Sequence, residues 1–405
     1  MLVASQHSSR AGEGPSSSPT IVYHQPVCSG TIPVGRWGFS SAVVGSCMYV
    51  FGGVGPSILD DLAVLDVELM IWRSLTPSAA RSKDRPDKLH AAAMCAVGST
   101  LWMFGGQQGR KHLRTLYSLN TDVLDWKLVT PAGAQPAARE GHTLTSVASS
   151  GLVYLFGGQG KKFYNDMFIL KPGGTDWVEI KAAGRVPSPR SGHSMVWDGG
   201  DRLVCFAGAA STTTDSALAV YSISSNTWAA VTAQGTAPTP RTRHTAVLLG
   251  PSSMLVFGGC NSAGVFFNDS YVLNLETWTW TRLQPLNPPP PPRYHHCCHL
   301  VDGKVVLYGG VNPKQAFGSC VLLQTSSGVQ ELSALAEELA RMTGSSISQP
   351  GAGAGSSAAA LLGAAAAGPG GSPLVGDLMK LQLRDLLVKR NMEELHVTAQ
   401  QKVSQ

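Results

Sequence analysis

One short stretch of the chain combines metal-binding and nucleophilic side chains, His295-His296-Cys297-Cys298-His299. Histidine and cysteine are the ligands that zinc prefers. If the stretch is a β-strand, His295, Cys297 and His299 share a face, but the outer two backbones stand about 13 Å apart because a strand rises ~3.3 Å per residue. Three ligands from one straight strand therefore cannot converge on one ion. A metal site here would need a bulge and a ligand from elsewhere, and we expect neither a metal nor another cofactor.

Arginine and histidine also recur together at the start of each of several similar segments. The clear copies and the weaker ones are Arg139-Glu140-Gly141-His142, Arg190-Ser191-Gly192-His193, Arg241-Thr242-Arg243-His244, Arg293-Tyr294-His295-His296, Arg36-Trp37-Gly38-Phe39 and Lys88-Leu89-His90. Residues that repeat in register usually belong to the architecture. We therefore interpret this series as satisfying hydrogen bonds within the fold, with no catalytic residue among them.

The same segments share further features that define a repeating unit of about 51 residues. A paired glycine follows an apolar run in five units, and Ala207-Gly208 is the degenerate copy. A tryptophan closes the unit at Trp72, Trp126, Trp177, Trp228 and Trp280. Each unit holds four β-branched or aromatic runs separated by turn residues, which predicts a four-stranded antiparallel meander. The pairs Asn165-Asp166 and Asn268-Asp269 open the third run and are interpreted as turn residues.

These residues make the chain resemble the kelch-repeat family, whose repeats are roughly 50 residues long and form the blades of a β-propeller. The resemblance covers residues 20 to about 325 and rests on the paired glycines, the mid-unit strand and the late tryptophan. It implies an all-β fold, a six-bladed propeller of four-stranded blades.

One count predicts how the ring closes. Trp126 and its later counterparts lie thirteen residues before the next arginine, and thirteen residues before Arg36 stands Tyr23. The sixth unit ends near Leu323 without a tryptophan strand. We therefore predict that the N-terminal strand around Tyr23 completes the sixth blade, which removes the free sheet edges of an open array.

Composition limits the classes of protein. The 405 residues are 43% hydrophobic with a formal net charge of +5 and eight cysteines. This charge is mild, and we expect no nucleic-acid partner. The cysteines fall mostly on apolar runs, which indicates reduced thiols in a cytoplasmic protein. No stretch approaches the ~20 apolar residues that span a bilayer.

The residues that do not repeat are the candidates for binding. In a four-stranded meander, the loop after each glycine pair lies at the same end as the connector between blades. Basic residues gather on these segments in the first three blades, and we predict that they dock an acidic protein segment. The candidate residues are Arg81, Lys83, Arg85, Arg110, Lys111, Arg114, Lys161, Lys162 and Phe163. The alternative is a solvated charged rim.

Outside the repeats the character of the sequence changes. Residues 1–19 are rich in serine, glycine and proline and predict a disordered tail or, as a weaker alternative, a targeting segment. Residues 326–343 predict a short helix, and 344–373 form a Gly/Ala/Ser-rich linker. Residues 374–405 predict an amphipathic helix that binds a partner, self-associates or packs on the propeller.

The resemblance implies a non-enzymatic scaffold or adaptor, similar in layout to the Rab-effector and cell-polarity kelch proteins. Trafficking, cytoskeletal and polarity processes are the implied settings. The alternatives are a substrate receptor of a ubiquitin ligase and a metal-dependent propeller enzyme. Iron-dependent specifier proteins of this fold carry a Glu-x3-Asp-x3-His array, and no glutamate here is followed by aspartate four residues later. Fold alone does not set function, so these classes remain open at this point.

Overall fold

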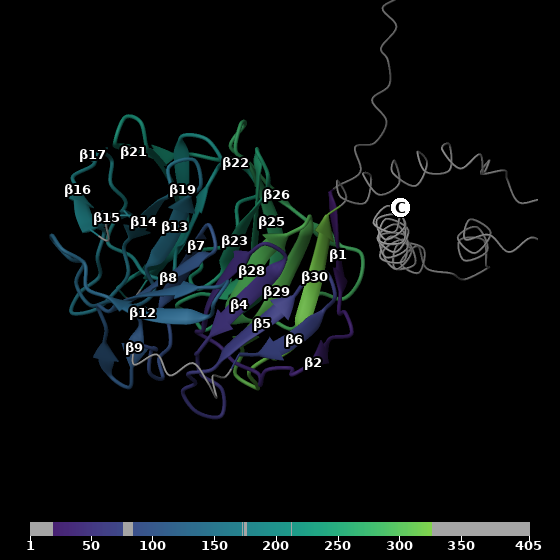
Figure 1. Cartoon of the computed structure of the whole chain (residues 1–405). Helices are drawn as coiled ribbons and strands as arrows, with labels where there is room; N and C mark the ends of the chain where they lie inside the picture. The colour runs from purple at the N-terminus through teal and green to yellow at the C-terminus, as the bar shows by residue number, and fades with distance from the viewer. Residues whose placement is uncertain (1–18, 76–83, 172, 174–175, 212, 326–405) are drawn as a thin grey trace, which may run out of the picture.

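The computed structural model describes residues 19–75, 84–171, 173, 176–211 and 213–325. Within these ranges the regular elements are all strands, arranged as six consecutive sheets in a ring (Figure 1). The expectations for residues 1–18 and 326–405, including both C-terminal helices, lie outside the described part.

Each blade is an antiparallel meander whose first strand lies innermost. The strands of blades 1 to 3, from the inside outwards, are β3 (Ser40–Val44), β4 (Cys47–Phe51), β5 (Leu62–Asp66), β6 (Ile71–Ser74); β7 (Ala93–Val97), β8 (Thr100–Phe104), β11 (Leu116–Asn120), β12 (Asp125–Val129); and β13 (Thr143–Val147), β14 (Leu152–Phe156), β15 (Met167–Lys171), β16 (Asp176–Ile180). Those of blades 4 to 6 are β18 (Ser194–Trp197), β19 (Arg202–Ala210), β20 (Thr213–Ser222), β21 (Thr227–Val231); β23 (Thr245–Gly250), β24 (Ser253–Cys260), β25 (Phe266–Asn274), β26 (Thr279–Arg282); and β28 (Tyr294–Val301), β29 (Lys304–Val311), β30 (Cys320–Thr325), β1 (Thr20–His24).

Short two-residue strands add to this plan. Four of them pair in parallel with the outermost strand of a blade, and two form a small hairpin in the loop of blade 2. The four are β2 (Ser29–Gly30), β17 (Ala183–Gly184), β22 (Gln234–Gly235) and β27 (Gln284–Pro285), and the hairpin consists of β9 (Gln107–Gln108) and β10 (Lys111–His112).

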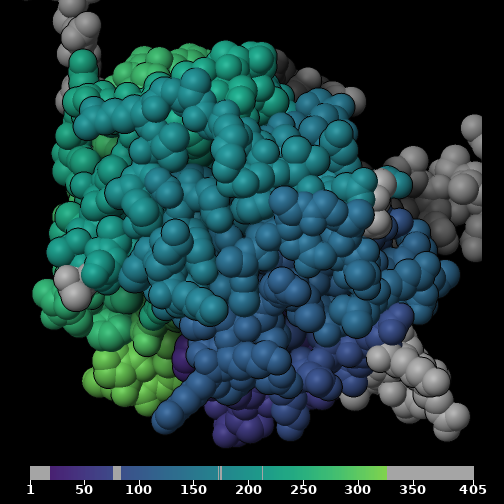
Figure 2. All heavy atoms as spheres, turned by 90° about the vertical axis from the view of Figure 1, so that its left-hand side faces the viewer, coloured from purple at the N-terminus to yellow at the C-terminus, as the bar shows by residue number. Residues whose placement is uncertain are grey.

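The N-terminal strand closes the ring, as the count from the tryptophans predicts. β1 pairs antiparallel with β30, with Tyr23 opposite Leu323. Figure 1 shows β30, the last strand of the described chain, beside β1, the first, and Figure 2 shows the opposite side of the ring, which the blue and teal middle of the chain forms. Tyr23 also takes the place of the tryptophan, since its ring lies 6.2 Å from that of Phe257 in blade 5. Blade 6 is therefore built from both ends of the propeller sequence.

The core lies between the blades. In every joint, an aromatic side chain on the outermost strand meets an aromatic side chain on the second strand of the preceding blade. The pairs and their ring-centroid distances are Trp72–Tyr308 at 4.8 Å, Trp126–Phe51 at 5.1 Å, Trp177–Phe104 at 5.3 Å, Trp228–Phe156 at 4.9 Å, Trp280–Phe206 at 4.8 Å and Tyr23–Phe257 at 6.2 Å. Such pairs add to the free energy of burying large apolar surfaces. A blade alone would leave one of these surfaces in water.

We expect β1, the strand that completes blade 6, to contribute as much to the free energy of unfolding as a strand in the middle of a blade. Ile21 of β1 is fully buried in a cluster with Leu307 and Val321. Ile21→Ala should lower the free energy of unfolding by about 2–5 kcal/mol, because it removes buried methyl groups and leaves a cavity. Urea denaturation measures this, and Val27→Ala is the control.

Val27 lies just after β1 and is 94% exposed, so its substitution should change stability by less than ~0.5 kcal/mol. If the two variants unfold at the same urea concentration, β1 is not part of the cooperative ring.

Candidate functional site

The connectors between blades and the loops between second and third strands lie at one end of the ring, which we call the loop face. The N–H of Arg139 donates to the carbonyl of Leu113 in the loop of blade 2, at 3.0 Å. The N–H of Arg190 donates in the same way to Tyr164 in blade 3, at 3.0 Å. Each connector is thus bonded to the loop of the preceding blade, so the prediction that these segments share an end is confirmed.

The recurring arginines are used by the fold. In four blades the buried guanidinium binds a carboxylate just before the third strand or in its first residues. The pairs are Arg36–Asp61 at 2.7 Å, Arg139–Asp166 at 2.5 Å, Arg190–Asp215 at 3.2 Å and Arg241–Asp269 at 2.7 Å. The same guanidinium donates to the carbonyl of the first glycine, or of Ala207 in blade 4. The interpretation of Asp166 and Asp269 as turn residues was therefore incomplete, because both are ion-pair partners.

Blade 2 departs from the pattern. The predicted alignment of Lys88 with the repeated arginines is wrong by one residue. The carbonyl of Leu89 accepts from Gly53, as that of Arg139 accepts from Gly106. Leu89 rather than Lys88 therefore stands at the arginine position, and Ala92 stands at the histidine position.

The recurring histidines are buried between blades. His193 Nε2 lies 3.2 Å from Thr143 Oγ1, and His296 Nε2 lies 3.0 Å from Thr245 Oγ1, in each case across the joint to the preceding blade. Burial lowers the pKa of His193 and of His296 to about 3, with the neighbouring arginine as a second cause. These imidazoles are neutral structural groups at pH 7.

The side chains of the His-Cys stretch diverge. The Cys297 thiol is 3.8 Å from the sulfur of Met48, whereas Cys298 packs in the cluster between blades 5 and 6. The His295 ring packs at a tilt against Trp37, with 5.4 Å between ring centroids, and His299 Nε2 lies 2.8 Å from Ser41 Oγ. No group of three potential metal ligands comes together among the described residues.

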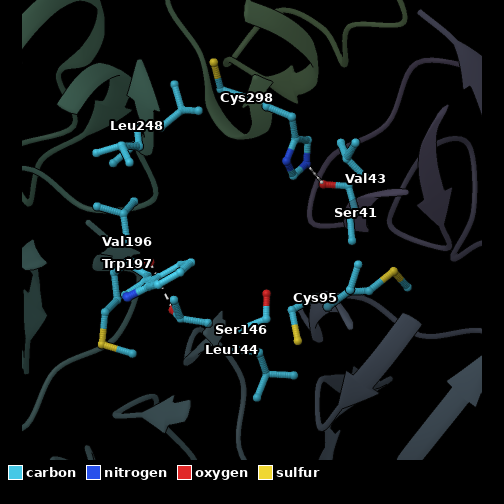
Figure 3. Close-up of a pocket in the computed structure, with 17 residues that line it drawn as sticks. Ser41, Val43, Cys95, Leu144, Ser146, Val196, Trp197, Leu248 and Cys298 are labelled. Carbon is cyan, nitrogen blue, oxygen red and sulfur yellow. Dashed lines mark hydrogen bonds between the residues drawn. The ribbon is translucent and has the colours of Figure 1, made fainter. Parts of the chain in front are cut away.

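A central cavity of about 390 Å³ is lined by the inner strands of all six blades (Figure 3). Apolar side chains such as Leu144 and Leu248 line it together with polar ones such as Ser146 and His299. Burial raises the pKa of the Cys95 thiol to about 12 and lowers that of His299 to about 4. The thiol is therefore protonated at pH 7 and the imidazole is a weak base. No carboxylate or other charged side chain stands among the lining residues to activate either group.

At the loop face, backbone hydrogen bonds join the connectors of neighbouring blades. The third residue of each connector bonds to the third residue of a neighbouring one, for example Ala91 N to Gly38 O at 2.6 Å and Arg243 N to Gly192 O at 2.6 Å. Ala91, Arg243 and His295 have φ of 55–56°, a region that non-glycine residues seldom adopt. The bonds between blades hold this conformation.

The predicted partner-binding residues lie on the loop face as far as the structure describes them. Arg110 and Lys111 are exposed at the tip of the β9–β10 hairpin, and Lys161 and Lys162 are exposed on the loop of blade 3. Arg114 is also exposed and Phe163 is half-buried. Arg85 is half-buried, and its guanidinium donates to the Asp60 carbonyl. Arg81 and Lys83 lie outside the described residues.

A polar chain that the sequence did not predict connects these loops. Gln159 Nε2 donates to Glu140 Oε1 at 2.9 Å, and His112 Nε2 lies 3.9 Å from the same oxygen. Ser191 Oγ donates to Gln159 Oε1 at 3.1 Å. Backbone bonds of the connector to both loops, Arg139 N to Leu113 O at 3.0 Å and Glu140 N to Gln159 O at 2.8 Å, hold the loop of blade 2 beside that of blade 3.

Comparison with known proteins agrees with this architecture. The KLHDC2/KLHL20/DRC7 kelch-repeats domain matches residues 19–208 and 198–359. The chain belongs to the kelch-repeat family. The resemblance seen in the sequence is thus confirmed.

Several curated kelch relatives are similar. Acyl-CoA-binding domain-containing protein 5 of Arabidopsis thaliana is 31% identical over 309 residues, which are 72% of this chain and 47% of that protein. Host cell factor of Drosophila melanogaster is 28% identical over 62% of this chain and 19% of its own. Human Kelch domain-containing protein 3 is 28% identical over 47% of this chain and 52% of its own. The chain thus spans about half or less of these relatives.

The buried histidines predict a pH dependence of stability. Below pH 6.5 the unfolded chain binds a proton at His193, whereas the folded chain excludes it until about pH 3. The unfolded state then binds more protons, so stability falls as the pH falls through this window, by about 1.4 kcal/mol per pH unit for each such group. His193→Phe, which copies Phe39 of blade 1, should reduce this slope by one proton between pH 6 and 4.5.

Urea denaturation at several pH values measures the slope. Thr143→Val is the matched control, because it removes the hydrogen bond to His193 and leaves its titration in place. An unchanged slope in His193→Phe would mean that this histidine takes up its proton in the folded state.

Proposed function

We propose that this kelch propeller is a non-enzymatic scaffold whose loop face docks an acidic segment of a partner protein. The observation that carries this proposal is the basic group formed by Arg110, Lys111, Arg114, Lys161 and Lys162. All five are exposed, and none forms an ion pair with another described residue. We call these five residues the basic patch, and Arg81, Lys83, Arg85 and Phe163 extend it in the proposal.

The contrast with the repeated arginines supports this role. Those four guanidinium groups are buried and paired within their own blades, so they are not available to a ligand. The unpaired charges stand instead on loops that differ between blades. Loops on a rigid scaffold are where proteins vary their binding without changing the core.

The relative positions of the two basic loops also favour a single docking surface. The backbone of connector residues Arg139 and Glu140 bonds to the loop of blade 2 at Leu113 and to the loop of blade 3 at Gln159. A partner would meet a fixed arrangement, which limits the entropy lost on binding. Glu140 is half-buried and already engaged by Gln159, so it offsets only part of the positive charge.

Other observations concern the cellular compartment and the process in which the protein works. The eight cysteines are free, which is consistent with a reducing compartment and supports a cytoplasmic location. The part of the chain that the structure describes holds no helix with the length and hydrophobicity to cross a bilayer. Relatives named for kelch domains and as host cell factor support a protein-binding role. We further propose that the protein works in trafficking, cytoskeletal or polarity processes and that residues 374–405 provide a second contact.

Reversal of the basic patch tests the proposal. In the variant Arg110→Glu, Lys111→Glu, Lys161→Glu, a partner isolated with the wild-type chain should associate at least ~10-fold more slowly at low salt, because charge steers the encounter. The rate at which this variant associates with the partner should also depend less on ionic strength. Surface plasmon resonance across salt concentrations measures both effects, and the melting temperature shows that the fold is intact.

The matched control reverses three exposed charges away from the loops, at Lys127, Lys171 and Arg282. Its net charge is the same as that of the patch variant. If both variants slow association equally, the effect is one of net charge and the patch is only a solvated rim.

A further inference from the structure

The six blades differ at the position where an arginine meets the carboxylate near the start of the third strand. Blades 1, 3, 4 and 5 keep both members of the pair. Blade 2 has lost both, since Leu89 stands at the arginine position. The carbonyl of Thr115 accepts from Gly105, as that of Asp166 accepts from Gly157. Both members of this pair are therefore neutral in blade 2.

Blade 6 has kept only the cation. Arg293 is 1% exposed, and its guanidinium carbon lies 3.9 Å from the centroid of the Phe317 ring. In blade 5, Arg241 lies over Phe267 at 4.4 Å, and the residue two further on is Asp269. The residue two beyond Phe317 is Ser319. A hydroxyl therefore stands where blade 5 has a carboxylate.

The remaining contacts of Arg293 do not replace the missing charge. Its Nε donates to the carbonyl of Pro291 at 3.2 Å, and its Nη1 donates to the carbonyl of Gly309 at 3.0 Å. Among the described residues, Nη2 has no hydrogen-bond partner and no carboxylate lies within ion-pair distance. Burial without a counter-charge lowers the pKa of Arg293 to about 10. A buried cation that lacks its partner is costly to the folded state.

The vacant position is at the surface. In the other blades the paired carboxylate side chains are 16–34% exposed, although their arginines are buried. Ser319 is half-buried and its side chain is shorter than that of aspartate, so a carboxylate brought from the loop face would lie where Asp269 lies in blade 5. A planar carboxylate fits the two parallel N–H groups of a guanidinium, which is the geometry that the other blades display.

We propose that Arg293 and the space beside Ser319 form a binding site for a carboxylate supplied from outside the propeller. The carboxylate belongs either to a small free acid or to an acidic side chain of a docked protein. It accepts from Nη1 and Nη2 of Arg293, as Asp269 does from Arg241. The site lies on the loop face, but its binding of a carboxylate does not depend on the basic patch.

The first test supplies the carboxylate within the chain. Full-length wild type and Ser319→Asp are melted in sodium chloride and in sodium acetate at equal ionic strength and pH 7. If the site takes a small free acid, the wild type should gain about 1–3 °C in acetate relative to chloride. Ser319→Asp should melt higher than the wild type in chloride and gain nothing further from acetate. Thr115→Asp is the matched control, since blade 2 has no arginine, and it should keep the wild-type response without the gain in chloride.

The second test separates the two sources. A hexaglutamate peptide with both ends blocked carries only side-chain carboxylates, and its affinity is measured by titration calorimetry. The site is assigned to a docked acidic segment if Ser319→Asp binds the peptide about 5-fold more weakly than the wild type does and acetate does not change the melting temperature. An acetate effect without a difference in peptide affinity assigns it to a small free acid.

The proposal is overturned if wild type and Ser319→Asp respond alike to both probes, or if neither responds. The latter result would mean that Arg293 is already satisfied from within the chain. If Ser319→Asp does not fold, Arg293→Leu, which copies Leu89, should lose the responses instead. The patch variant with reversed Arg110, Lys111 and Lys161 should keep the acetate response, so failure of this proposal and failure of the proposed function are distinguishable.

Discussion

The joint between consecutive blades is the interaction on which the rest of the structure depends. At each connector the main chain bonds to the preceding blade while the side chain at the arginine position reaches into its own blade. In blade 3, for example, the N–H of Arg139 bonds to blade 2 and its guanidinium to Asp166 of blade 3. An aromatic pair such as Trp177 and Phe104 covers the same joint further out. Because the sixth joint returns to the first blade, every blade packs against a neighbour on both sides.

Residues that form the joints between blades differ in character from those on the loops. The joint residues are repeated, buried and neutral or paired, as His193 and Arg139 are. They recur in most blades, with Leu89 and Ala92 as the replacements in blade 2, whereas the loops differ from blade to blade. The basic hairpin of blade 2 and the loop of blade 3 are differences of this kind. Blade 6 differs in another way. It has the buried Arg293 but no carboxylate like those that pair with the arginines of blades 1, 3, 4 and 5.

Much of the fold could be predicted from the sequence, because a repeat in register reports the same environment several times. Tyr23 was placed in blade 6 by counting alone, and the pairing with Leu323 confirms it. Blade 2 was misaligned because Leu89 and Ala92 retain neither the charge nor the ring that marks the other copies. The ion pairs of Asp166 and Asp269 were missed because an aspartate before a strand has the same sequence signature as a turn. The contacts of Glu140 with Gln159 and His112 depend on side-chain directions that no pattern specifies.

Hydrogen–deuterium exchange on the unmodified chain tests the closed ring most directly. If β1 is an integral strand of blade 6, its amides should exchange only when the whole ring opens, with the same protection as those of β14 in blade 3. Protection of β14 together with fast exchange throughout β1 would contradict the account, because the first strand would then leave the ring while the other blades stayed folded.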